Sequence, residues 1–200
     1  MKTGFAFDLD GTVTLEELLP LIAKQAGLSE EIELLTRLTI DGTLSFGASF
    51  KLRFAILKSL PFADVQSVTS AARLDPEISA FIAAHPDQCR IVTGNIPQWI
   101  KPLVDRVGCG LYSSEASASE THPLALTRII NKADAINAMR GEFDRVVAIG
   151  EGANDVPMFD AADISIAYGG VHDPAPALLE VSDYATYENR ALCRLLNMLS

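Results

Sequence analysis

The sequence predicts an α/β protein built around a parallel sheet, because two apolar segments far apart in the chain each run directly into acidic residues. The first segment, residues 4–7, precedes an acidic turn at residues 8–10, and the second, residues 146–149, precedes one at residues 151–155. Short apolar segments of this kind are typical of buried parallel strands. Because ligands bind beyond the carboxyl ends of such strands, we expect both turns to lie at one functional edge.

The composition favours a packed globular protein and excludes several classes of function. The chain has 200 residues, 48% of them hydrophobic, and a formal net charge of −10. We expect neither nucleic acid nor a membrane as a partner, since binding to both draws on basic patches. The three cysteines form no disulfide or metal-ligand pattern, and no leader peptide or membrane span is expected. The expectation is a cytoplasmic protein, monomeric or homodimeric.

The first acidic turn has the chemistry of covalent phosphoryl transfer. Asp8 and Asp10 are two residues apart, so their carboxylates point to the same side if the extended backbone continues. Like charges this close leave one carboxylate ionised and fit to attack, and the other fit to donate a proton. Asp8 would be the nucleophile and Asp10 the general acid and base. The alternative is an ordinary Asp-Gly turn that ends a strand.

The second acidic turn predicts a metal site. Gly150 and Gly152 allow a sharp turn, and Glu151 and Asp155 then lie beyond a strand end. Mg²⁺ prefers such oxygen ligands together with substrate phosphates. The alternative is a solvated turn with two incidental acids.

Residues 14–74 change to helical periodicity and predict an inserted helical unit. The expected helices span residues 15–26, 29–41, 45–60 and 63–72. Pro20 is expected to kink or restart the first helix, and Ser29 and Ser45 are expected to cap the second and third.

From residue 75 onward the sequence predicts the helices and strands of an α/β core. We expect helices over residues 77–84, 96–107, 132–139, 157–161 and 190–199, and strands over residues 90–92 and 164–167. Residues 112–127 are assigned to a hairpin or loop, and a looser segment begins at residue 169.

Three further positions offer groups that bind phosphate. Thr93 and Gly94 follow a predicted strand, where a hydroxyl and an unobstructed backbone N–H can donate to phosphate oxygens. Lys132 begins a predicted helix and would supply a fixed positive charge. Each of these has an ordinary alternative, a common strand end for Thr93 and Gly94 and a solvated cation for Lys132. The histidines are assigned no catalytic role.

Taken in order, these segments resemble the four motifs of the haloacid dehalogenase (HAD) superfamily. The matching segments are residues 8–12, residues 93–94, Lys132 and residues 150–155. The resemblance implies a Rossmann-like HAD core over residues 1–13 and 75–200, and a helical cap over residues 14–74. It implies that Thr93, Gly94 and Lys132 bind the phosphoryl group. It also implies that Mg²⁺ is held by Asp8, the backbone carbonyl of Asp10, Glu151 and Asp155.

The cap resembles that of the phosphoserine phosphatase family. In that family a cap glutamate receives the substrate ammonium and a cap arginine its carboxylate, and the matching positions are Glu17 and Arg53. The physical chemistry agrees, since arginine pairs bidentately with a carboxylate. The alternatives are a helix-start acid for Glu17 and a solvated face for Arg53. The resemblance adds Ile40, Phe46 and Asn154 as further residues of the substrate pocket.

Three residues depart from the pattern of that family. Glu151 replaces an aspartate and is one methylene longer, so the metal or its bound water is expected to shift. Ile40 replaces a methionine in the cap pocket, and Asn95 replaces a glycine near the expected leaving group.

The sequence therefore predicts a Mg²⁺-dependent phosphomonoesterase that acts on a small phosphorylated metabolite, with phosphoserine as the first expectation. The reaction would be two displacements through an aspartyl-phosphate, with the cap closing over the substrate. Three alternatives stay open: action on or transfer from another small phosphomonoester, a catalytically impaired metabolite-binding regulator, and, more remotely, a phospho-accepting receiver.

Overall fold

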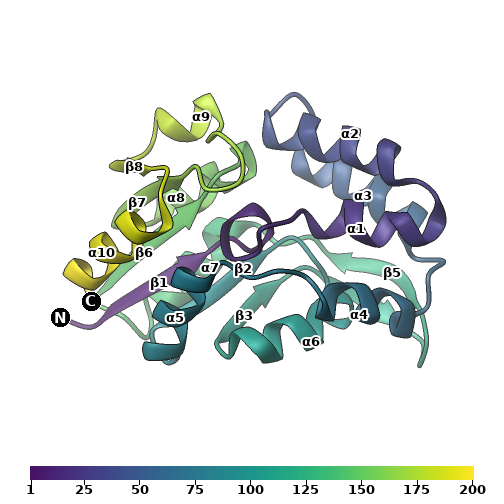
Figure 1. Ribbon diagram of the computed structural model, residues 1–200, viewed down its shortest axis with the longest axis horizontal. Coiled ribbons are helices and arrows are strands. Elements are labelled where there is room, and N and C mark those ends of the chain that lie inside the picture. The colour runs from purple at the N-terminus through teal and green to yellow at the C-terminus, as the bar shows by residue number, and fades with distance from the viewer.

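Six strands form one sheet in which all neighbouring strands are parallel (Figure 1). In spatial order they are β3 (Gly110–Ser113), β2 (Cys89–Thr93), β1 (Thr3–Phe7), β6 (Arg145–Gly150), β7 (Ile164–Tyr168) and β8 (Tyr184–Thr186). The computed structural model describes residues 1–200. The chain fills one half of the sheet before it crosses to the other half beside β1, and ligands bind at such a reversal of strand order. The predicted α/β fold with a parallel sheet is confirmed.

Ten helices surround this sheet. They are α1 (Leu18–Ala23), α2 (Ser29–Ile40), α3 (Phe46–Leu57), α4 (Phe62–Ser70), α5 (Pro76–Ala84), α6 (Pro97–Val107), α7 (Lys132–Met139), α8 (Val156–Ala161), α9 (Pro176–Leu179) and α10 (Asn189–Leu199). Shorter helical turns lie at Leu9–Val13, Lys24–Ala26 and Ala153–Asp155. None of the helices combines the length and the apolar composition needed to cross a lipid bilayer.

The sheet is buried on both faces because its residues alternate between two apolar clusters. Phe5 and Phe7 of β1 point to the cluster that includes α5, α6 and α10, whereas Ala6 points to the cluster of α7, α8 and α9. Side chains along a strand alternate in this way, so a strand covered on both faces is apolar throughout. On the first face, the ring of Phe81 in α5 meets Phe5 edge to face, with 5.1 Å between the ring centroids.

The helical segment of residues 14–74 leaves and rejoins the sheet at one place. Thr14 and Leu74 form an antiparallel bridge, and the backbone N–H of Asp75 donates to the carbonyl of Val13 at 2.9 Å. Figure 1 shows α1, α2 and α3 grouped together at one end of the sheet, whereas α4 lies beside α6. The two adjacent connections are compatible with the predicted boundaries of a cap, which stay a prediction.

Several helix starts differ from the expectations. The first helix begins only at Leu18, so Pro20 lies in its first turn, where the missing N–H has no helical partner to lose, and no kink results. Ser29 is already helical, and Leu28 precedes the helix, so the expected cap at Ser29 is wrong. Ser45 does occupy the capping position of α3, but its side chain makes no capping hydrogen bond.

The segment assigned to a hairpin or loop contains both a core strand and a hairpin. Its first residues belong to β3, and β4 (Glu115–Ala118) and β5 (Pro123–Arg128) then pair antiparallel as a separate sheet. The backbone N–H of Phe62 donates to the carbonyl of Thr121 in the hairpin turn at 2.8 Å, which ties the hairpin to the start of α4. In the looser segment after residue 169, α9 and β8 were not predicted.

A matched pair of glycine substitutions tests the packing of β1. Gly4→Ala would place a Cβ 2.5 Å from Cδ2 of Phe143, whereas Gly47→Ala in α3 meets no atom within 4 Å. Over-packing costs about 1–3 kcal/mol, and alanine in a helix is favoured over glycine by roughly 0.5–1 kcal/mol. Chemical denaturation should show Gly4→Ala to be less stable than the wild type and Gly47→Ala to be at least as stable. Equal stability of Gly4→Ala and the wild type would contradict this packing.

Candidate active site

The predicted site residues converge at the carboxyl ends of β1, β2 and β6, which are neighbours in the sheet. Nine of them line one cavity of about 50 Å³: Asp8, Asp10, Glu17, Ile40, Phe46, Arg53, Gly94, Glu151 and Asn154. The other three predicted residues are buried behind the cavity wall. Thr93 is hydrogen-bonded to Asn95, which lines the cavity. Lys132 is hydrogen-bonded to both Asp8 and Asp155. The fold therefore brings all twelve residues together, while their individual roles stay predictions.

Lys132 is held between two carboxylates. Its ammonium donates to Oδ1 of Asp8 and to Oδ1 of Asp155, and all three side chains are almost inaccessible to solvent. Lys132 is the first residue of α7, whose start is fixed by the Asn131 side chain, which accepts a hydrogen bond from the N–H of Ala133. Burial disfavours the ammonium, but the charges of Asp155 and Asp8 outweigh it and raise the pKa of Lys132. A permanent cation thus fixes the position of the predicted nucleophile.

This one cation does not balance the negative charge around Asp8. Burial and the nearby charge of Asp155 raise the pKa of Asp8 well above its ordinary value, and Lys132 offsets only part of that rise. A carboxylate attacks only when it is ionised. The site therefore needs further positive charge before Asp8 can act as a nucleophile.

The surroundings of Glu151 also lack positive charge. Its side chain is 2% exposed, and Oε2 is buried without a hydrogen-bond partner. Burial, followed by the charges of Glu17 and Asp8, raises the pKa of Glu151 to about 10. An unpaired buried carboxylate is costly, and a hard divalent cation with oxygen ligands removes that cost. The donor set that the resemblance implies therefore fits Mg²⁺.

The acidic turn after β6 is held by its own hydrogen bonds, and its Glu151 side chain lies against Gly11 in the turn after β1. Oδ2 of Asp155 accepts hydrogen bonds from the N–H groups of Glu151 and Gly152 at 3.1 and 3.0 Å, which fixes the turn after β6. Gly11, in the turn after β1, has a φ of 72°, and any side chain there would overlap the Glu151 carboxylate. A glycine is required at that position for both reasons.

Both oxygens of Asp10 are engaged. Oδ1 accepts from the N–H of Leu18 at 2.9 Å, and Oδ2 accepts from Nδ2 of Asn95 at 2.8 Å. Burial, followed by the charge of Glu17, raises the pKa of Asp10 to about 7. A group with a pKa near neutrality exchanges protons in both directions, as a general acid and base must. Sequence reasoning treated Asn95 only as a departure from a pattern and missed its contact with Asp10.

The phosphate-binding candidates of the second motif lie next to α3 of the helical segment. Thr93 is fully buried, and its Oγ1 accepts hydrogen bonds from the backbone N–H and from Nδ2 of Asn95, both at 3.2 Å. A Cβ at Gly94 would overlap the ring of Phe46, the first residue of α3. The absence of a side chain at Gly94 therefore lets α3 reach the end of β2.

Arg53 is a buried cation with unused hydrogen-bonding capacity. Nη1 donates to Oγ1 of Thr36 at 3.1 Å, whereas Nε is buried without a partner. Burial lowers the pKa of Arg53, and the charges of Asp10 and Glu17 oppose that shift. No carboxylate lies within ion-pair distance of its guanidinium. A guanidinium placed in this way is suited to receive an anionic group from a ligand.

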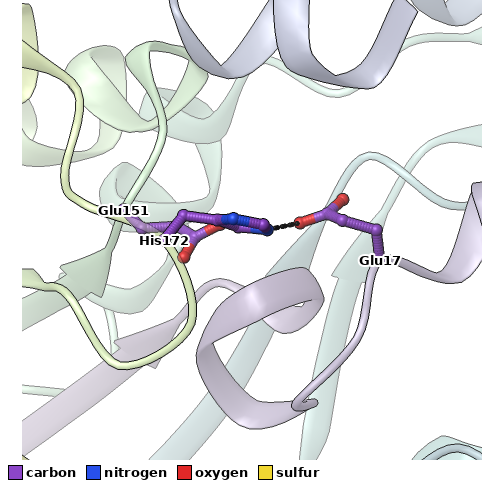
Figure 2. Close-up of side chains that lie close together, drawn as sticks. All are labelled: Glu17, Glu151 and His172. Carbon is purple, nitrogen blue, oxygen red and sulfur yellow. Dashed lines mark ion pairs between the residues drawn. The ribbon is translucent and has the colours of Figure 1, made fainter. Parts of the chain in front are cut away.

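A histidine that the sequence analysis left without a role joins the site. Nε2 of His172 lies 3.5 Å from Oε1 of Glu17 (Figure 2). Ligand atoms of Glu17, Glu151 and His172 all lie within 4.8 Å of one another. Because Glu151 already belongs to the implied magnesium site, this group is not a separate metal centre. No local pattern could have revealed His172, since it lies in a loop 155 residues from Glu17.

Comparisons with known proteins agree with this geometry. The chain is 30% identical over 209 aligned residues to the phosphoserine phosphatase of Halobacterium salinarum, and the alignment covers 98% of this chain and 97% of that protein. It is 26% identical over 184 residues to the phosphoserine phosphatase of Methanocaldococcus jannaschii, covering 84% and 85%.

Solved structures share the fold. A substrate-bound phosphoserine phosphatase complex superposes with a TM-score of 0.82 at 22% identity, covering 97% of each chain. A phosphoserine phosphohydrolase-like protein from Francisella tularensis superposes with a TM-score of 0.78 at 23% identity, covering 98% of this chain and all of the other.

The family model for haloacid dehalogenase-like hydrolase matches residues 5–160. The chain therefore belongs to the haloacid dehalogenase-like hydrolase family. Within that family it is a phosphomonoesterase similar to the phosphoserine phosphatases.

The contact between Asn95 and Asp10 predicts a change in pH dependence. Asn95→Gly removes a hydrogen bond that stabilises ionised Asp10, so the pKa of Asp10 should rise. A hydrogen bond to a charged group contributes about 1.5–3 kcal/mol, and one pKa unit corresponds to roughly 1.4 kcal/mol. If Asp10 acts as the base, the acidic limb of the kcat profile should move up by about one pH unit, measured with saturating Mg²⁺ in both proteins. An unchanged limb, in a variant that is still active, would contradict this role of Asn95.

Proposed function

We propose that this protein is a Mg²⁺-dependent phosphatase that hydrolyses a small phosphorylated amino acid, with phosphoserine as the first candidate, through an aspartyl-phosphate. The observation that supports it best is the placement of Asp8 and Asp10 on one buried turn, with Lys132 beside Asp8 and Arg53 across the same cavity. This combination provides a nucleophile, a proton donor and two cations for a doubly anionic substrate.

In the first displacement, the Asp8 carboxylate attacks phosphorus and the bond to the substrate oxygen breaks. Asp10 gives its proton to that oxygen, which leaves as an alcohol. Thr93, Gly94 and Lys132 hold the phosphoryl oxygens through hydroxyl, backbone N–H and ammonium groups. Bound Mg²⁺ would supply positive charge that keeps Asp8 ionised and offsets the charge of the phosphoryl group.

In the second displacement, Asp10 takes a proton from water, and the resulting hydroxide attacks the phosphorus of the aspartyl-phosphate. The bond to Asp8 breaks, so that inorganic phosphate and the Asp8 carboxylate are released. Asp10 thus acts first as an acid and then as a base, which a pKa of about 7 suits.

The metal ion would be held by Asp8, the backbone carbonyl of Asp10, Glu151 and Asp155. The unpartnered Oε2 of Glu151 provides a free ligand atom at this position. The extra methylene of Glu151 is accommodated against Gly11, where no side chain intervenes.

We propose residues 14–74 as the cap that selects the substrate. Arg53 would receive the carboxylate and Glu17 the ammonium, with Ile40, Phe46 and Asn154 shaping the rest of the pocket. A cavity of about 50 Å³ has room for only a few water molecules. The helices above it must therefore separate to admit a phosphorylated amino acid and then close, which sheds water before the reaction.

Phosphate release from a panel of phosphoamino acids and sugar phosphates, with Mg²⁺ or Mn²⁺, tests the activity and the nucleophile together. O-phosphoserine should be hydrolysed, and Asp8→Asn should reduce turnover to the background rate, because an amide cannot form the acyl phosphate. Asp64→Asn, on the exposed surface of α4, serves as the control and should keep wild-type activity. Full turnover by Asp8→Asn would rule out the aspartyl-phosphate mechanism.

The role of Arg53 is tested by pairing two substrates. Arg53→Ala should raise KM for O-phosphoserine by roughly 10- to 100-fold, the cost of a lost charged hydrogen bond. It should change KM little for phosphoethanolamine, which lacks the carboxylate. Arg37→Ala, an exposed arginine on α2, should leave both KM values unchanged. Equal losses for the two substrates would show that Arg53 supports the fold and does not recognise the carboxylate.

A further inference from the structure

His172 reaches the site from a loop that is fixed at both ends. The loop runs from the end of β7 to the start of α9. The N–H of Gly169 donates to the carbonyl of Thr186 at 2.8 Å, and the N–H of Ala175 donates to the carbonyl of Glu151 at 2.9 Å. The second of these bonds attaches the loop to the acidic turn after β6, so the position of His172 is coupled to that of Glu151.

The imidazole faces a carboxylate that a substrate would otherwise use. Figure 2 shows His172 and Glu17 pointing toward each other from separate segments, with Glu151 alongside His172. His172 is the only basic group within ion-pair distance of Glu17, and its Nε2 has no hydrogen-bond partner. Glu17 also lines the cavity that contains Arg53.

The contact between His172 and Glu17 is weak enough for a cation from a ligand to replace it. At 3.5 Å it is longer than a direct charge-assisted hydrogen bond, and the two side chains are 39% and 18% exposed. Partly exposed pairs of this kind contribute little, so a cation from a ligand can displace the imidazole at small cost.

Without a partner, Glu17 would add to the excess of negative charge in the cavity. Its charge already contributes to raising the pKa values of Asp10 and Glu151. An ammonium group of a substrate would compensate Glu17, but a substrate without an amine would not. In that second case His172 remains beside Glu17, with Nε2 3.5 Å from Oε1.

We propose that His172 is a specificity-determining residue: it occupies Glu17 when no ammonium is bound, so that the site accepts small phosphorylated carboxylic acids with or without an amine. This inference rests on the proposed function. His172 weakens the binding of the aminated substrate, which must displace it, and supports the binding of the substrate that lacks the amine.

The test compares O-phosphoserine with 3-(phosphonooxy)propanoate, its analogue without the amine. His172→Ala should lower KM for O-phosphoserine about three-fold, the size expected of a partly exposed pair. KM for the analogue should rise, because Glu17 then faces the ligand without a partner. The ratio of the two kcat/KM values should therefore shift toward the aminated substrate, and an unchanged ratio would overturn the proposal.

Two further variants separate this role from others. In a Glu17→Gln background, His172→Ala should no longer change the ratio, because the pair is already broken; a ratio shift of the same size would overturn the competition for Glu17. His122→Ala, in the hairpin turn, is the matched control and should leave the ratio unchanged. If His172 only fastened the loop to the cap, both KM values would change together.

The outcomes also distinguish this inference from the function on which it rests. If the wild-type protein hydrolyses neither compound, the proposed function fails. If it hydrolyses both compounds and the ratio does not respond to His172→Ala, or if it hydrolyses O-phosphoserine alone, the function stands and the role of His172 fails. Thermal unfolding of each variant shows whether the fold is retained.

Discussion

The structure depends on a single buried ammonium that cannot neutralise the carboxylates around it. Lys132 pairs with Asp8 and Asp155, yet Asp10, Glu17 and Glu151 border the same cavity. Their burial and mutual repulsion raise the pKa values of Asp8, Asp10 and Glu151 together. Such a site has affinity for any added positive charge. The parallel sheet opposes this repulsion, because the backbone hydrogen bonds between β1 and β6 hold the two acidic turns next to each other.

The core half of the site was predictable because its signals are local. An apolar strand followed by Asp8 and Asp10, or by Glu151 and Asp155, places carboxylates at a strand end whatever the distant packing. The helix start at Lys132 likewise follows from Asn131 as its cap. By contrast, α9 and β8 have four and three residues, too few for a hydrophobic period to show. The expected kink at Pro20 was wrong because the effect of a proline depends on where the helix begins. That start, at Leu18, is decided by packing.

Two contacts at the site were not predictable from the sequence because they join distant residues. Asn95 donates to Asp10 across 85 positions of the chain, and Phe46 covers Gly94. These contacts place the proposed acid and base directly below the elements that would recognise the substrate. A change in the position of the helical segment would therefore alter the surroundings of Asp10 as well as the fit of the proposed ligand. In the proposed mechanism, recognition and proton transfer would be coupled through Asn95, which donates to Asp10, and Glu17, whose charge raises the pKa of Asp10.

The distribution of charge is compatible with the polyanionic substrate that we propose for this acidic protein. A phosphorylated carboxylic acid brings two anionic groups into a cavity that already contains carboxylates, so its binding depends on where positive charge is fixed. Lys132, beside Asp8, would face the phosphoryl group in the proposed reaction, and Arg53 lines the cavity from α3. Glu17 then lies where an anion would be repelled and a cation attracted. His172 contacts Glu17 from outside the cavity, and in the proposed competition it would weaken that repulsion until an ammonium group of a ligand displaces it. In the proposed function, the orientation of the substrate would follow from the spacing of two fixed cations and one carboxylate whose charge is partly compensated.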